Sequence, residues 1–224
     1  MRLDGKVVLI AGSSGALGQV IAPACLEAGA KVITVNRRLP SAQIKGIDAM
    51  TGDVTDEADT RRLVTDVTQK AGRLDVLINL VGGFAEGRVQ ETDAMVWQRM
   101  LAMNLTSGFL LSRAVLPAMT RQQAGRILHI AAKAAVDPFP GATAYIVAKS
   151  GLVALVRTLA LELTGSGVTV NGVLPGTIDT PNNRKSIPDA NPSQWVKPES
   201  IAHLLLFLAS DEASQINGAL IPVG

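Results

Sequence analysis

The sequence predicts one α/β domain built on a doubly wound parallel sheet. Short apolar segments rich in β-branched residues alternate with longer helical patterns along all 224 residues. This alternation is typical of right-handed strand–helix–strand crossovers, which give parallel sheets with helices on both faces. Four consecutive apolar residues, Val7 to Ile10, lead into a glycine-rich turn and then a helical pattern. That first unit indicates a Rossmann-type sheet, and residues 1–224 are expected to form a single domain.

The elements are placed in order from apolar runs and helical periodicity. Strands are expected at 6–11, 31–36, 47–52, 74–80, 126–131, 168–173 and 218–222. Helices are expected at 16–28, 56–71, 92–121, 143–165 and 198–210. Pro23 falls inside the first helix, where it predicts a kink or a lost hydrogen bond.

One long segment, at about 177–197, lacks such a pattern and is rich in Pro, Asn and polar residues. Irregular loops of this length are commonly lids or binding loops. Ligands of such sheets lie outside the carboxyl ends of the strands, so this segment is predicted to be a substrate loop. Trp195 is a candidate hydrophobic anchor for it, with simple packing as the alternative.

The composition argues against several classes of function. The 21 basic and 19 acidic residues are scattered, so nucleic acid is not an expected partner. The single cysteine, Cys25, cannot form an internal disulfide and fits a reducing, cytoplasmic location. No apolar run approaches the roughly 20 residues of a membrane helix, and no membrane contact is expected. His129 and His203 lie far apart in sequence, and no metal site is expected.

The glycine-rich turn predicts a dinucleotide site. Glycines permit a tight turn and let a pyrophosphate approach the backbone at the positive end of the following helix. The expected cofactor contacts in this turn are Gly12, Ser13, Ser14, Gly15, Ala16, Leu17 and Gly18.

Tyr145 and Lys149 are four residues apart in a helical segment and therefore lie on one face of the helix. A phenol with a pKa near 10 is a poor acid or base at pH 7 unless a neighbouring cation lowers that pKa. We expect the Lys149 ammonium to lower the pKa of Tyr145.

Together these features resemble the short-chain dehydrogenase/reductase family over nearly the whole chain. Gly52-Asp-Val-Thr55 is similar to the family turn that contacts adenine, and 74–83 is similar to its Asn-Asn-Ala-Gly strand, with Leu80 replacing the second Asn. Met103-Asn-Leu105 matches the helix that anchors a proton-relay water, and 170–180 matches the segment that cradles nicotinamide. The resemblance adds these cofactor contacts: Asp53, Val54, Asn79, Gly82, Lys149, Pro175, Gly176, Ile178 and Thr180.

The resemblance also implies roles for three catalytic residues. Tyr145 supplies a proton during hydride transfer from the cofactor, and Lys149 lowers its pKa and holds the nicotinamide ribose. Asn104 connects Lys149 to solvent through a water molecule.

Two positions depart from the family pattern. Ala16 occupies the place of the middle glycine of the turn, and Gly15 precedes it. Ala132 stands 13 residues before Tyr145, where the family has a catalytic serine. A hydroxyl there would donate a hydrogen bond to the substrate oxygen as negative charge develops, and such a donor is worth roughly 3 kcal/mol. Ordinary ketone reduction is therefore disfavoured.

One branch of the family, the dihydropteridine reductases, shares both departures. Gly15-Ala-Leu-Gly18, Ala132-Lys-Ala-Ala-Val-Asp137, 174–181 and Gly82-Gly-Phe-Ala-Glu-Gly87 are similar to that branch. The similarity implies a small conjugated imine or carbonyl substrate, such as a quinonoid dihydropterin, which needs a proton donor more than a carbonyl clamp. The expected substrate contacts are Ala132, Phe84, Tyr145 and Arg184.

The preferred cofactor is expected to be NADPH rather than NADH. Members of the family that bind NAD generally place an acidic residue near position 36, which here is Asn36, and Arg37 and Arg38 follow it. Guanidinium groups pair well with a 2′-phosphate. The alternative is that both arginines are solvated surface charges, and dihydropteridine reductases typically use NADH.

Two other functions remain open. The first is a generic carbonyl or ketoacyl reductase, in which Thr143 or a water molecule replaces the missing hydroxyl. The second is a catalytically weak NADP(H)-binding regulator, with Ala132 marking lost activity. By analogy with the family, the chain is expected to form a homodimer or homotetramer through helices 92–121 and 143–165.

Overall fold

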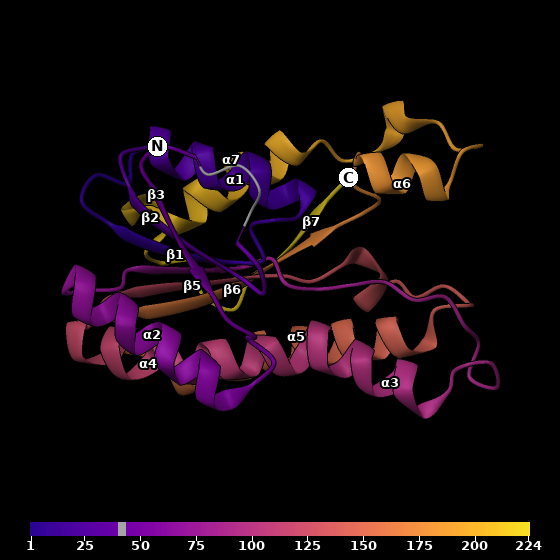
Figure 1. Ribbon diagram of the computed structural model, residues 1–224, viewed down its shortest axis with the longest axis horizontal. Helices are drawn as coiled ribbons and strands as arrows, with labels where there is room; N and C mark the ends of the chain where they lie inside the picture. The colour runs from indigo at the N-terminus through magenta and orange to yellow at the C-terminus, as the bar shows by residue number, and fades with distance from the viewer. Residues whose placement is uncertain (40–43) are drawn as a thin grey trace.

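The computed structural model describes residues 1–39 and 44–224 and has three layers, a sheet between two layers of helices (Figure 1). The sheet has seven parallel strands in the order β3-β2-β1-β4-β5-β6-β7. The strands are β1 (Val7–Ala11), β2 (Lys31–Asn36), β3 (Ile47–Thr51), β4 (Val76–Asn79), β5 (Gly125–Ile130), β6 (Val168–Pro175) and β7 (Leu220–Val223). The predicted Rossmann-type sheet is confirmed, with every strand within two residues of its predicted bounds.

Helices cover both faces of this sheet (Figure 1). One face carries α1 (Ala16–Glu27) and α7 (Pro198–Ala209). The other carries α2 (Glu57–Ala71), α4 (Ser107–Gln122) and α5 (Thr143–Glu162). Successive side chains of a strand point to opposite faces, so β1 contributes to both cores, and this explains its uninterrupted apolar sequence.

The strand order fixes where a ligand can bind. From β1 the chain moves through β2 to β3 on one side, and then through β4 to β7 on the other. Sheets of this kind bind ligands outside the carboxyl ends of the strands, at the point where the order reverses. Here that point lies between β1 and β4, next to the glycine-rich turn.

The single helix predicted at 92–121 is observed as three consecutive elements. α3 (Ala94–Leu101) continues into a π-helical turn, η1 (Ala102–Thr106), and then into α4. A π turn holds one more residue than an α turn and is frequent at functional sites. Asn104 lies at its centre and is buried. The prediction of one regular helix was wrong because the apolar pattern does not show a one-residue insertion.

The predicted loop at 177–197 contains two short helical elements, α6 (Pro181–Ser186) and η3 (Pro192–Gln194). α6 begins there because Thr180 caps it, with its Oγ1 accepting a hydrogen bond from Asn183 N at 3.2 Å, and because Pro181 suits the first helical position. Figure 1 shows α6 outside the main layers, beyond the carboxyl end of the sheet.

Pro23 and Cys25 both lie in α1. The helix continues through Pro23, so the proline does not end it. Cys25 is fully buried in the core, and burial raises the pKa of its thiol to about 12. At neutral pH this thiol is therefore protonated and packs as a small apolar side chain.

α5 is long and apolar enough to cross a membrane by length and composition alone. The same helix contributes Val156 and Leu159 to the core beneath the sheet. Core helices of this kind satisfy the same length and composition criteria, so this match is weak evidence for a membrane span.

The geometry of the glycine-rich turn shows at which positions a side chain cannot be accommodated. Gly12 has a φ of +82°, a conformation that side chains disfavour. Gly18 has no room for a side chain, because a Cβ there would lie 2.2 Å from the backbone of Ser13. Ala16 is the first residue of α1, so the methyl group at this departure from the family pattern is accommodated on the helix.

Gly18→Ala is expected to lower the free energy of unfolding by about 1–3 kcal/mol, because the new methyl group overpacks the turn. Gly15→Ala is the matched control, since its new Cβ would have no neighbour closer than 3.7 Å. Urea denaturation of both variants measures the difference. Equal losses in the two variants would contradict the steric explanation.

Candidate functional site

α5 brings Tyr145 and Lys149 to the carboxyl end of β5. Lys149 is only 5% exposed, and its Nζ donates a hydrogen bond to the carbonyl of Ile130, the last residue of β5, at 2.7 Å. Burial lowers the pKa of the Lys149 ammonium from 10.5 to about 8. Because this pKa still lies above 7, the charged form predominates at neutral pH.

The expected effect of Lys149 on Tyr145 is not observed in this structure. Burial raises the pKa of the Tyr145 phenol from 10.0 to about 12, because removal from water disfavours the phenolate. The Lys149 ammonium is directed at the Ile130 carbonyl instead. Tyr145 is consequently protonated at neutral pH, as a proton donor must be.

Asn104 holds the backbone of Gly83. Its Oδ1 accepts from Gly83 N at 3.1 Å, while its Nδ2 donates to Gly83 O at 3.0 Å and to Met100 O at 3.1 Å. Both amide protons are thus used by backbone carbonyls. The side chain of Asn104 therefore holds the backbone of Gly83 in place. It forms no direct hydrogen bond with Lys149, which donates to Ile130 O.

Gly82 lies between Asn104 and Lys149. A Cβ added there would lie 2.8 Å from Asn104 Oδ1 and 3.2 Å from Lys149 Nζ. The two side chains therefore converge on this glycine. A residue larger than glycine would push them apart.

Ala132 lies two residues beyond the carbonyl that binds Lys149. It is 6% exposed, has extended backbone, and precedes the short helix η2 (Lys133–Ala135). Ser150 of α5 fixes that short helix by donating to Ala135 O at 2.9 Å. The segment is therefore held to α5, and it carries a methyl group at the position where the resemblance implies a hydroxyl.

Phe84, an expected substrate contact, lies against Tyr145. The two ring centroids are 5.0 Å apart with the rings at 74°, an edge-to-face arrangement. The Phe84 side chain is nevertheless 54% exposed. A backbone bridge between Gly87 and Ala142 ties the end of this loop to the start of α5, which leaves the Phe84 ring available to a ligand.

Asn36 is tied to the glycine-rich turn. Its Oδ1 accepts from Ser14 N and its Nδ2 donates to Ser13 Oγ, each at 2.8 Å. Asn36 thus shapes the turn rather than presenting its amide freely to a ribose. Arg37 and Arg38 follow it and are exposed.

The next strand end supplies Asp53 and Val54. Asp53 Oδ1 accepts from Thr55 N at 2.9 Å and from Thr55 Oγ1 at 2.6 Å, which forms a tight turn. Its own N donates to Asp59 Oδ2. Val54 is buried, so its backbone rather than its side chain would contact a ligand.

Pro175 ends β6, and the segment that follows carries Gly176, Ile178 and Thr180 past the same edge of the sheet. A backbone bridge pairs Ile178 with Val196, and Ile178 O accepts from Asn183 Nδ2 at 2.8 Å. The two ends of the 177–197 segment are therefore joined, and the residues between them project beyond the sheet.

Arg184, an expected substrate contact, pairs with Asp179 in this structure. Its Nε and Nη2 donate to the two carboxylate oxygens of Asp179, at 2.6 and 2.8 Å. This paired contact, a few residues apart in sequence, fastens α6 to the segment that follows β6 and occupies the guanidinium fork.

Sequence reasoning overlooked a buried polar chain beside the site. His129, on β5, has Ser112 Oγ 3.0 Å from Nε2 and Asn79 Nδ2 3.3 Å from Nδ1. Burial, together with the charge of Lys149, lowers the pKa of His129 to about 4. One signal was present in the sequence, a histidine inside the apolar strand 126–131, but it was considered only as a metal ligand.

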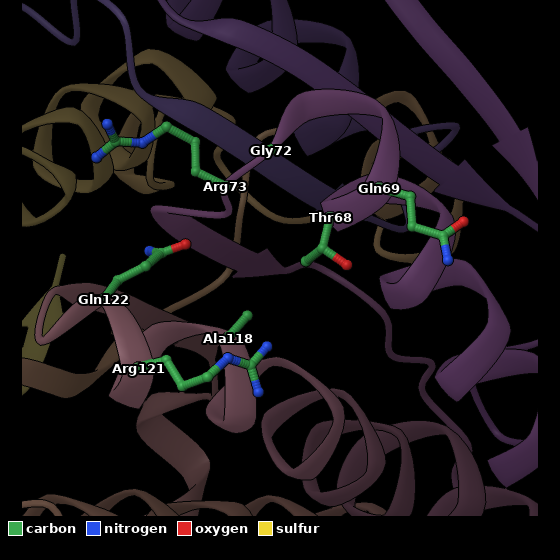
Figure 2. A pocket seen from close by; sticks show the side chains of 7 residues that line it. All are labelled: Thr68, Gln69, Gly72, Arg73, Ala118, Arg121 and Gln122. Atoms are coloured by element: carbon green, nitrogen blue, oxygen red, sulfur yellow. The ribbon is translucent and has the colours of Figure 1, made fainter.

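A separate cavity of about 330 Å³ lies between the last turns of α2 and α4, at the opposite end of the strands. Figure 2 shows Arg73 and Arg121 extending in different directions from its walls. Arg73 pairs with Asp75, and Gln122 bonds the backbone of Leu74. Among residues 1–39 and 44–224, no group of three His, Cys, Asp or Glu side chains is placed to hold a metal.

Comparison with known proteins adds to this geometry. A family model described as short chain dehydrogenase matches residues 6–191. The 3-oxoacyl-[acyl-carrier-protein] reductase FabG of Thermotoga maritima is 32% identical over 243 residues, which cover 100% of this chain and 98% of that protein. The 2-(S)-hydroxypropyl-CoM dehydrogenase 3 of Xanthobacter autotrophicus is 32% identical over 245 residues, covering 99% and 96%. The solved aldohexose dehydrogenase of Thermoplasma acidophilum has a TM-score of 0.90 at 29% identity, covering 99% of this chain and 92% of that chain.

The lowered pKa of Lys149 predicts a pH dependence of stability. Between pH 8 and 10.5 the unfolded chain keeps a proton that the folded chain has released, so stability rises with pH in this window. Relative to Lys149→Met, the free energy of unfolding of the unchanged protein is expected to rise by about 3 kcal/mol between pH 7 and 10.5. Urea denaturation of both proteins at several pH values provides the measurement, and a pH-independent difference would contradict burial of the ammonium.

Proposed function

The chain belongs to the short-chain dehydrogenases, and on this premise we propose that it is an NADPH-dependent reductase of a small conjugated imine or carbonyl compound. The observation that carries the proposal is the combination of a protonated, half-buried Tyr145, whose ring packs against Phe84, with an alanine at position 132. The site retains its proton donor and lacks the hydroxyl that would stabilise a developing oxyanion.

The residues around the switch point fit a dinucleotide. Gly12 and Gly18 keep side chains out of the turn, and the turn leads into the N-terminus of α1. Gly82 leaves space beside Lys149. A bound nicotinamide dinucleotide would supply the hydride for the reduction.

Tyr145 and Lys149 have complementary roles in this proposal. A phenol with a pKa of about 12 is fully protonated at pH 7, so Tyr145 can give its proton to the nitrogen or oxygen of the substrate. The resulting phenolate would be stabilised by the positive charge of Lys149, whose pKa of about 8 keeps its ammonium charged at pH 7. Proton donation corresponds to the reductive direction, whereas oxidation requires the phenolate at the start.

The alanine at position 132 favours a substrate in which charge is delocalised. When a simple ketone is reduced, negative charge gathers on one oxygen, and an oxyanion donor contributes roughly 3 kcal/mol to that transition state. In a conjugated imine the accepted electrons spread over several atoms, and protonation matters more. Phe84 offers an exposed ring beside Tyr145 against which a planar substrate can pack.

The second candidate is a carbonyl or ketoacyl reductase. The names of the two curated relatives, a 3-oxoacyl reductase and a hydroxypropyl-CoM dehydrogenase, favour this class. Neither is a dihydropteridine reductase, so the narrower resemblance to that branch rests on the sequence segments alone. In a carbonyl reductase, Thr143 or a water molecule would have to replace the missing donor.

Association into a homodimer or homotetramer is part of the proposal. Phe109 on α4 and Val147 and Leu161 on α5 are large apolar side chains that remain exposed. Exposed apolar residues on neighbouring helices support a contact between subunits on this face.

The experiment that tests the function measures NADPH and NADH oxidation with quinonoid dihydropterin, a 3-oxoacyl thioester and simple ketones. We expect the conjugated substrate to be reduced fastest, and Tyr145→Phe to lower kcat at least about a hundredfold, because it removes the proton donor. Faster reduction of the 3-oxoacyl thioester would replace this proposal by the second candidate. Binding of NADPH without turnover of any substrate would identify a regulator.

Ala132→Ser is expected to raise kcat for simple ketones by about 10- to 100-fold, because it supplies the missing hydrogen-bond donor. The rate with the conjugated substrate should change less. Ala131→Ser, a hydroxyl at the neighbouring buried position, is the matched control. An unchanged ketone rate in the Ala132 variant would show that the missing hydroxyl is not what limits this chemistry.

Arg37→Ala is expected to raise the Kd for NADPH about tenfold and to leave the Kd for NADH nearly unchanged, since only NADPH carries the 2′-phosphate. Fluorescence titration measures both constants, with Arg38→Ala as the comparison. Equal effects on the two cofactors would assign Arg37 to the solvated surface.

A further inference from the structure

His129 lies at the centre of a short polar chain inside an otherwise apolar layer. Its side chain is 0% exposed, between β4 and α4. Gly108 of α4 lies next to it: a Cβ there would be in contact with the imidazole at 3.5 Å and with Asn79 Nδ2 at 3.4 Å, and would clash with Leu152 at 2.7 Å. A buried polar side chain needs a partner for each polar atom.

One arrangement of protons satisfies this chain. Ser112 has a single hydroxyl proton, which it donates to Gly108 O at 2.7 Å, so its oxygen accepts from His129 Nε2–H. His129 Nδ1 is then unprotonated and accepts from Asn79 Nδ2. The remaining atom of the amide, Asn79 Oδ1, accepts from Val81 N at 3.1 Å.

The orientation of Asn79 matters because of the segment that follows it, residues 80–83. Leu80 N donates to Ala11 O at 2.9 Å, and a Cβ added at Gly12 would lie 3.0 Å from Val81 N. Gly82 and Gly83 then pass beside Lys149 and Asn104. This one segment touches both the glycine-rich turn and the catalytic lysine.

We propose that His129 is a positioning residue that, through the amide of Asn79, holds segment 80–83 in the shape that receives the nicotinamide end of the cofactor. The imidazole fixes which end of the Asn79 amide faces Val81. Without an acceptor at His129 Nδ1, no hydrogen bond would keep Asn79 Nδ2 pointing inward. The amide could then rotate, and Val81 N would lose its fixed acceptor, Asn79 Oδ1. The inference rests on the proposed binding of NADPH.

The test is a double-mutant cycle read out by the Kd for NADPH. His129→Leu is expected to raise this Kd about tenfold in the unchanged background and less than twofold in an Asn79→Ala background, because its effect passes through Asn79. KM for NADPH should rise more than kcat falls. An equal rise in Kd in both backgrounds, or no rise in the first, would overturn the inference.

Two control variants separate positioning from a general loss of stability. Val115→Ala removes part of a fully buried side chain on α4, and should lower stability while leaving the Kd within twofold. His129→Gln keeps one acceptor and one donor and is expected to restore the Kd to within threefold. A Kd that follows stability across all variants would also overturn the inference.

If His129→Leu does not fold, Ser112→Ala replaces it, since loss of the Nε2–H acceptor frees the ring to turn a protonated nitrogen toward Asn79. A Kd unchanged in that variant would count against the inference. If the unchanged protein binds neither NADPH nor NADH, the proposed function fails together with the inference, whereas normal binding with an unaffected His129 variant removes the inference alone.

Discussion

The hydrogen bond from Lys149 to the carbonyl of Ile130 joins α5 to the sheet, and the rest of the candidate site depends on it. The bond seats a charged group where it is almost completely removed from water, which is costly unless the charge is hydrogen-bonded. It also sets the height of α5 relative to β5. Tyr145, one turn earlier on the helix, and Ala132, two residues beyond the carbonyl, are placed by the same contact.

Three asparagine side chains hold the loops at this edge of the sheet. Asn36, Asn79 and Asn104 each bond a backbone N–H of a loop: those of Ser14, Val81 and Gly83. Loops at the ends of strands have backbone groups that the sheet no longer pairs, and each must find a partner when it is buried. The amides supply those partners, so the shape of the edge is set by a few polar side chains.

The sequence was sufficient for the sheet and for most of the helices around it, since apolar runs bounded by glycines and polar residues mark them clearly, but it missed the π turn within 92–121. It also placed Tyr145 and Lys149 one turn apart on a single helix, as α5 shows. It was insufficient where the partner is a backbone atom distant in sequence, as for Asn104 with Gly83. The same holds for the direction of the Tyr145 pKa, because the degree of burial is a property of the fold. The pairing of Arg184 with Asp179 was not foreseen either, because it depends on how α6 turns.

The π turn at Ala102–Thr106 has a consequence for how this helix can vary in length. An α-helical residue advances the helix by about 100° of rotation. The additional residue in the π turn therefore offsets the faces of α3 and α4 by about that angle, so that Asn104 faces Gly83 while α4 still faces the sheet. Deleting one residue here would restore a regular helix and turn one of these two faces away from its target. Insertions and deletions within this turn are therefore excluded more strictly than most substitutions.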